Sequence, residues 1–232
     1  MKEFWQNSVF FGVFISILTY EIGVLIKKKW NVALFNPLLI SIILIIVFLQ
    51  CFHVDYETYE SGAKYLSYFL TPATVALAVP LYEQIEPLKK NWKAIIAGIL
   101  AGTLTSAVCV LVFALLFGFS HKQFVTLLPK SITTAIGMGM SEELGGIVTI
   151  TVASIVVTGL LGNMFAETIC RLFHIMDPVA VGIGIGTASH AMGTAKAMEL
   201  GEVEGAMSSL SIAVSGLLTV VVAIVFSNIY PL

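Results

Sequence analysis

The sequence contains little charge. Only 11% of its 232 residues are Asp, Glu, Lys or Arg, against about 25% in soluble domains, whereas 58% are hydrophobic. So few charged side chains cannot cover a globule of this length with a solvated surface. This composition excludes an ordinary soluble enzyme, a nucleic-acid-binding protein and a disordered tail. The formal net charge of −2 is too small to indicate a polyanionic partner.

Cysteine and catalytic motifs are also scarce. The three cysteines, Cys51, Cys109 and Cys170, lie within or beside apolar runs and lack ligand spacing, which excludes a disulfide framework and a zinc site. The four histidines have no metal-ligand spacing either, and the sequence contains no G-x-S-x-G, H-E-x-x-H or P-loop motif. We therefore expect no enzymatic activity, no metal and no cofactor.

Long apolar runs dominate the chain instead. A bilayer core about 30 Å thick requires about 20 apolar residues per helical span. Such runs lie near 5–26, 32–53, 64–82, 94–118, 144–166, 178–198 and 205–230. A further stretch, 124–143, is interrupted by polar residues and is either a full span or a re-entrant hairpin. The sequence predicts an all-α, multi-pass protein of the cell membrane with seven to eight membrane segments, in one transmembrane domain over residues 1–232.

Two polar, interrupted stretches lie about half the chain length apart. Residues 71–80 and 189–197 are both rich in small and hydroxylic side chains, and each is followed by glutamates and an apolar run. The similarity is either chance or an internal two-fold repeat with halves 1–116 and 117–232. Paired interrupted helices leave backbone groups free near the membrane midplane, which is typical of transporter binding sites.

Small residues recur at a spacing of four in three of the apolar runs. On a helix this spacing places them on one face, where they allow close approach of a neighbouring helix. We interpret these stripes as packing faces: Gly98, Gly102 and Ser106; Thr158, Gly162 and Ala166; and Gly182 with Gly186.

Lys130 is a cation in apolar surroundings, where a lysine at the bilayer centre costs roughly 2.5–3.5 kcal/mol. Pro129 suits the first turn of a helix, so we expect a helix to start there and to place Thr133 and Thr134 on the face of Lys130. Free N–H groups at a helix start beside a cation and hydroxyls suit a carboxylate. The alternative is an interfacial lysine after a short loop.

The segment around Lys196 has a similar composition. His190 and Thr194 share a helical face, and Gly193 permits a break in the helix. His190 is either a ligand or a hydrogen-bonded packing residue. Lys196 either faces the same site or extends to the interface, where Glu199 would pair with it.

Several motifs occur in one order along nearly the whole chain, and they resemble the LrgB/CidB-like membrane protein family. The motifs are 69–82, 128–136, 145–147, 177–180, 184–197 and 202–207. The Pro-Lys-Ser motif at 129–131 and the Gly-Thr-Ala-Lys motif at 193–196 look more like the CidB-type branch. Val181 stands where relatives often carry arginine, which puts any role of that charge in doubt.

The resemblance implies two competing activities. One is holin- or antiholin-like control of murein hydrolase activity and cell lysis, together with a small LrgA/CidA-like membrane partner. The other is transport of small hydroxy- and keto-monocarboxylates, as in pyruvate-transporting bacterial relatives and the plastid glycolate/glycerate transporter. A nonspecific pore needs a polar stripe that many copies line, whereas this chain concentrates polarity in interrupted segments. The residues therefore favour transport.

We accordingly expect a secondary transporter of a small monocarboxylate such as pyruvate, lactate, glycolate or glycerate. Alternating access would come from rocking or elevator-type movement, and elevator transporters suggest a homodimer by analogy. The expected substrate-binding residues are Lys130, Ser131, Thr133, Thr134, Thr71, Thr74, His190, Gly193, Thr194 and Lys196.

Overall fold

The computed structural model describes residues 10–30, 35–76 and 78–230, and within these residues every regular element is a helix. The chain divides after Ala76 into two compact units. The expected all-α class is confirmed. The expected number of membrane segments, the two-fold repeat and the elevator-type architecture stay predictions.

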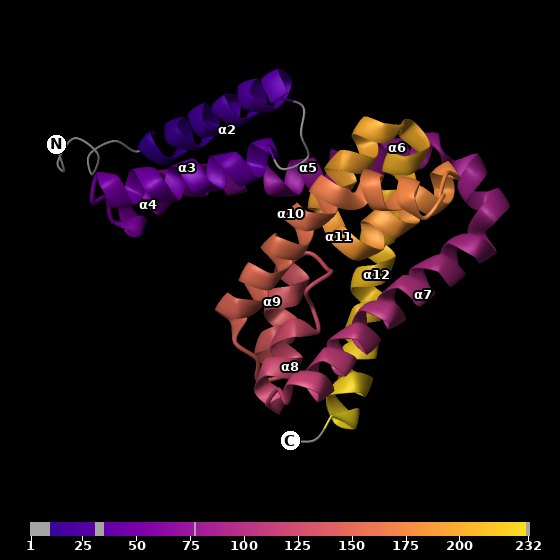
Figure 1. Ribbon diagram of the computed structural model, residues 1–232. Coiled ribbons are helices and arrows are strands. Elements are labelled where there is room, and N and C mark those ends of the chain that lie inside the picture. The colour runs from indigo at the N-terminus through magenta and orange to yellow at the C-terminus, as the bar shows by residue number, and fades with distance from the viewer. Residues whose placement is uncertain (1–9, 31–34, 77, 231–232) are drawn as a thin grey trace. The chain divides into compact units, whose positions relative to one another are not determined.

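The first unit contains α2 (Phe11–Trp30), α3 (Pro37–Cys51), α4 (Tyr56–Ser67) and α5 (Leu70–Ala76). Helix α2 packs on both α3 and α4 (Figure 1). Two glycines allow this contact, because a Cβ on Gly12 would overlap the backbone of α4 and a Cβ on Gly23 would overlap Pro37. A buried hydrogen bond of 2.8 Å between the Thr19 and Ser41 hydroxyls joins α2 to α3.

The apolar run 64–82 is not one continuous helix. Helix α4 ends at Ser67, α5 covers Leu70–Ala76, and α6 covers Ala78–Glu83, while Leu77 lies outside the described residues. Pro72 and Pro80 each occupy the third position of a short helix, where a missing N–H removes no intrahelical hydrogen bond. The prolines therefore fit the starts of short helices better than the interior of a long one.

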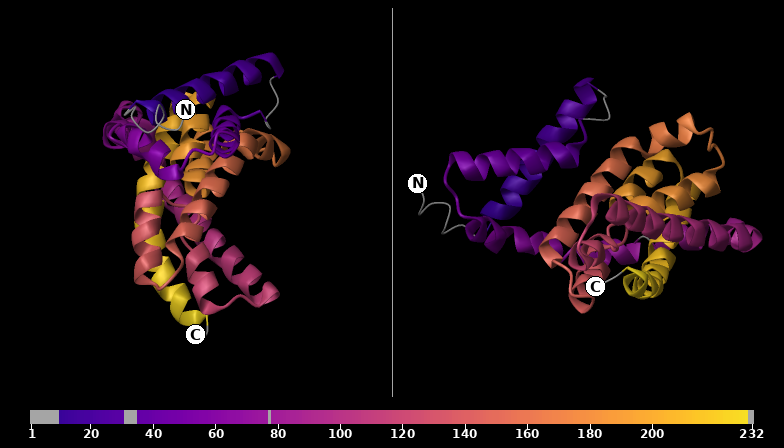
Figure 2. Two further views of the ribbon diagram at one scale, coloured as in Figure 1. Left: turned by 90° about the vertical axis from the view of Figure 1, so that its left-hand side faces the viewer. Right: turned by 60° about the horizontal axis from the view of Figure 1, so that its bottom comes forward.

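The second unit starts with α6 and continues through six further helices. They are α7 (Ile85–Phe117), α8 (His121–Leu127), α9 (Thr134–Glu143), α10 (Val148–Leu172), α11 (Pro178–Leu200) and α12 (Glu202–Ile229). Helix α11 is central and packs on α7, α10 and α12; Figure 2 shows α10, α11 and α12 side by side. Among the residues that the structure describes, three segments are long and apolar enough to cross a bilayer: Lys89–Phe117, Val148–Leu172 and Glu202–Ile229.

The small-residue stripes form the close contacts around α11. On α7, Gly98 lies against Ile183 and Gly102 lies against Thr187, and a Cβ on Gly102 would be 2.9 Å from the Thr187 hydroxyl. On α11, a Cβ on Gly182 or Gly186 would overlap the backbone of α12. The interpretation of these stripes as packing faces is confirmed.

Candidate functional site

Lys130 lies in a break between two short helices. Helix α8 ends at Leu127, and Pro129 has no N–H with which to continue its hydrogen-bond ladder. Tight turns follow, because the N–H of Lys130 donates to the carbonyl of Leu127 and the N–H of Ile132 donates to that of Pro129. Helix α9 begins only at Thr134. The expectation that a helix starts at Pro129 was wrong, and Lys130 shares no helical face with Thr133 or Thr134.

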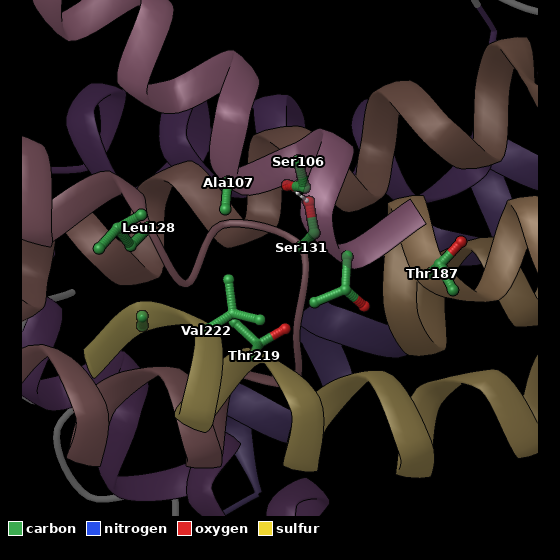
Figure 3. Close-up of a pocket in the computed structure, with 9 residues that line it drawn as sticks. Ser106, Ala107, Leu128, Ser131, Thr187, Thr219 and Val222 are labelled. Atoms are coloured by element: carbon green, nitrogen blue, oxygen red, sulfur yellow. Dashed lines mark hydrogen bonds between the residues drawn. The ribbon is translucent and has the colours of Figure 1, made fainter. Parts of the chain in front are cut away.

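The break directs the ammonium group of Lys130 into a chain of hydroxyls. Its Nζ donates a hydrogen bond of 2.9 Å to Ser131 Oγ. Ser131 Oγ is in turn 3.1 Å from Ser106 Oγ on α7 (Figure 3). Ser131 is buried, whereas Lys130, Thr133 and Thr134 are partly exposed. The structure thus brings Lys130 and Ser131 together and links both to α7.

A small cavity lies where the break meets α7, α11 and α12. It has a volume of about 10 Å³, which is roughly the space of one water molecule. Hydroxyl-bearing residues from all four elements line it: Thr103, Ser106, Ser131, Thr187 and Thr219 (Figure 3). Sequence reasoning named Ser106 only as a packing residue and missed Thr103, Thr187 and Thr219. Thr103 and Ser106 are three residues apart beside a small-residue stripe, and this spacing was a usable signal.

Helix α11 is interrupted at His190, as expected for the stretch 189–197. His190 has φ 43° and ψ −141°, which is outside the helical region, whereas Gly193 lies in the regular second half of the helix. The Nε2 atom of His190 is 3.0 Å from the carbonyl oxygen of Ile155 on α10. Two glycines of α10 allow this approach, because a Cβ on Gly159 would crowd His190 and one on Gly162 would overlap Ser189.

The hydroxyl of Thr194 belongs to the same interrupted segment. It donates to the carbonyl oxygen of His190 at 3.0 Å and lies 2.6 Å from Ser208 Oγ on α12. Thr194 is fully buried and His190 is 3% exposed. These contacts favour the alternative in which His190 is a hydrogen-bonded packing residue.

Lys196 forms ion pairs with two carboxylates. Its Nζ is 3.1 Å from Glu167 Oε2 on α10 and 3.3 Å from Glu199 Oε2. Glu167 also forms an ion pair with Arg171, at 2.7 Å. Two acidic side chains therefore compensate the charge of Lys196, which favours the alternative of a lysine paired near the surface.

The expected site residues form separate groups in the described part of the chain. No hydrogen bond or ion pair there joins Lys130 or Ser131 to His190, Thr194 or Lys196. Thr71 and Thr74 belong to α5, but their side chains lie outside the described residues. No cluster of three His, Cys, Asp or Glu side chains that could hold a metal occurs among the described residues. Substrate binding by these residues stays a prediction.

Comparison with known proteins confirms the resemblance to the LrgB/CidB-like family that the sequence motifs indicated. Residues 16–229 match the sequence model of the LrgB-like family. The proteins named antiholin-like protein LrgB from Bacillus mycoides (strain KBAB4) and Bacillus cereus (strain B4264) are each 38% identical to this chain over 218 residues, covering 94% of this chain and 95% of the relative. No solved structure matches the chain. The chain, a membrane protein, therefore belongs to the LrgB-like family.

Proposed function

We propose that this chain is an antiholin-like, multi-pass protein of the cell membrane that helps to control murein hydrolase activity and cell lysis. The near full-length match to relatives named antiholin-like is the observation that carries this proposal. A small LrgA/CidA-like membrane protein is the partner that we propose. The activity requires no catalytic step by this chain.

The distribution of polar groups supports a protein that restrains lysis without itself forming a pore. On α12, Ser208, Ser211 and Ser215 are buried, whereas Leu217 and Val221 are exposed. A lytic pore built from many copies needs polar side chains on outward faces, where they can line a channel between the copies. The buried serines of α12 cannot serve that purpose without a rearrangement of the helices.

Deletion of the gene in its own host tests this proposal. We expect faster detergent-induced autolysis and stronger murein hydrolase bands in zymograms, and both should return to the wild-type level when the chain is supplied from a plasmid. The purified chain in liposomes should not release a trapped dye. Unchanged autolysis after deletion, or dye release by the chain alone, would contradict an antiholin-like role.

The break at Lys130 favours a second candidate function, which is transport of a small monocarboxylate by alternating access. The ammonium group of Lys130 is hydrogen-bonded to Ser131, which is in turn hydrogen-bonded to Ser106, so that these groups offer convergent donors to a carboxylate. Helix breaks of this kind are typical of transporter sites. We propose pyruvate, lactate, glycolate or glycerate as the substrate and Lys130 with Ser131 as the residues that contact it. A homodimer that moves in the elevator manner is part of this second proposal.

Proteoliposomes with a trapped dye inside, placed in a solution of labelled pyruvate, test this second candidate. We expect saturable uptake without dye loss, and an increase of about tenfold in KM for Lys130→Met, which equals about 1.4 kcal/mol. Lys196→Met is the matched control and should change KM less, because Glu167 and Glu199 already compensate that charge. Absence of saturable uptake would disprove transport. Equal KM values for the two variants would disprove the role of Lys130.

A further inference from the structure

Thr103 carries a buried hydroxyl group that has no hydrogen-bond partner in the described part of the chain. The residue is only 5% exposed, lies on α7 and lines the small cavity beside Ser106 and Ser131. Nearly all buried polar side-chain atoms in proteins are hydrogen-bonded to protein or to ordered water, because an unpaired one has lost its hydration without compensation. The free hydroxyl of Thr103 therefore indicates that the cavity has an occupant.

A second hydroxyl proton is available to the same cavity. Ser106 and Ser131 have two hydroxyl protons between them, and their mutual hydrogen bond of 3.1 Å uses one, whichever residue donates. The ammonium group of Lys130 donates to Ser131 Oγ and cannot accept a hydrogen bond, so neither hydroxyl proton of the serines is donated to it. One proton of the serine pair remains free, in addition to the proton of Thr103.

Thr187 contributes an acceptor to the cavity. Its hydroxyl proton is donated to the carbonyl oxygen of Ile183 at 2.7 Å, so that its lone pairs remain available. None of the residues that line the cavity within the described chain is acidic, and the ammonium group of Lys130 is hydrogen-bonded to one of them, Ser131, at 2.9 Å. These surroundings disfavour a cation and favour an atom that accepts hydrogen bonds.

We infer that this cavity binds a single hydrogen-bond-accepting oxygen through Thr103 and the Ser106–Ser131 pair. The volume of about 10 Å³ admits one such atom. A buried water can supply it, accepting from Thr103 and a serine and donating to Thr187. One carboxylate oxygen of a small anion can also supply it, and only this second source rests on the transport proposal.

Thr103→Val tests the inference because valine keeps the shape of threonine and removes the hydroxyl. If an oxygen occupies the cavity, Thr103→Val loses a hydrogen bond, and the melting temperature of the purified chain should fall by about 2–4 °C. Thr105→Val is the matched control, since Thr105 lies on the same helix but is exposed. If the cavity is empty, the substitution removes an unpaired buried hydroxyl, and the melting temperature of Thr103→Val should equal or exceed that of the control. That result would overturn the inference.

Melting in the presence of pyruvate distinguishes the two sources of the oxygen. With a bound water, the decrease in Thr103→Val is the same with and without pyruvate. With a carboxylate, pyruvate raises the melting temperature of the wild type and of Thr103→Ser but not that of Thr103→Val. Uptake by the same samples separates this inference from the transport proposal, because a destabilised Thr103→Val without any wild-type uptake would disprove transport and still support a bound water.

Discussion

The Nε2 atom of His190 lies 3.0 Å from the carbonyl oxygen of Ile155, and this contact joins the interruption of α11 to α10. A carbonyl oxygen only accepts hydrogen bonds, so Nε2 carries the proton and donates it. His190 also has a positive φ of 43°, which is unfavourable for a residue with a Cβ. The hydrogen bond therefore helps to hold a backbone conformation that the residue would otherwise avoid.

Replacement of His190 should separate the hydrogen bond from the backbone strain. Both His190→Ala and His190→Gly should be less stable than the wild type by about 1–3 kcal/mol, because both variants lose the buried hydrogen bond to the carbonyl of Ile155. His190→Gly should be the more stable of the two by about 1 kcal/mol, since glycine adopts this φ without strain. Chemical denaturation in mixed micelles measures both values.

The control is Ala188→Gly, at an exposed position in the first half of α11, before the interruption. Glycine should destabilise the chain there by about 0.5–1 kcal/mol. If alanine at position 190 were at least as stable as glycine, the strained conformation would be disproved.

Gly162→Ala should weaken the packing of α10 on α11. The added Cβ would overlap the side chain of Ser189, next to the interruption, and overpacking of this kind costs about 1–3 kcal/mol. Gly139→Ala is the control, because a Cβ on Gly139 meets no atom within 4 Å and alanine favours the helix. Thermal melting should show a decrease for the first variant and an unchanged or higher value for the second. A tolerated Gly162→Ala would mean that the helices are further apart.

Thr151→Val should destabilise the attachment of α8 and α9 to α10. The buried hydroxyl of Thr151 lies 2.8 Å from the carbonyl oxygen of Thr126 and 2.7 Å from Ser141 Oγ, and its loss leaves both groups without this partner. The expected cost is about 1–3 kcal/mol in the free energy of unfolding. Thr149→Val, at an exposed position of the same helix, should have little effect. Equal stabilities of the two variants would show that this network contributes nothing.

Glu167→Gln should lower stability in a manner that depends on salt. Glu167 pairs with both Lys196 and Arg171, and the loss of two partly exposed ion pairs costs on the order of 1 kcal/mol at low ionic strength. Glu199→Gln removes only the longer and more exposed contact with Lys196, so its effect should be smaller. Melting temperatures in low salt and in about 1 M salt measure the difference, which should decrease as the ions are screened. A difference that does not change with salt would indicate that the ion pairs are not its cause.

Local patterns predicted the features that depend on neighbours along the chain. The interruption near His190 follows from the small, polar composition of its segment. The ion pair of Glu167 with Arg171 is likewise local, because the two residues are four apart on one helix. The start of α9 was predicted incorrectly because Pro129 marks the end of α8 and is followed by tight turns before the next helix. A proline suits both a helix start and a helix end, and local sequence does not distinguish them.

The sequence by itself determined that this is an all-helical membrane protein of the LrgB-like family, because composition, apolar runs and ordered motifs are properties of the chain alone. Only the tertiary structure decided which polar groups meet. It paired Lys196 with a carboxylate of α10, hydrogen-bonded His190 to Ile155, and placed Thr103 and Ser131 in the lining of one cavity. The physical reason is that a hydrogen bond or ion pair depends on distances of a few ångströms between atoms. Helix packing sets those distances between residues that lie far apart along the chain.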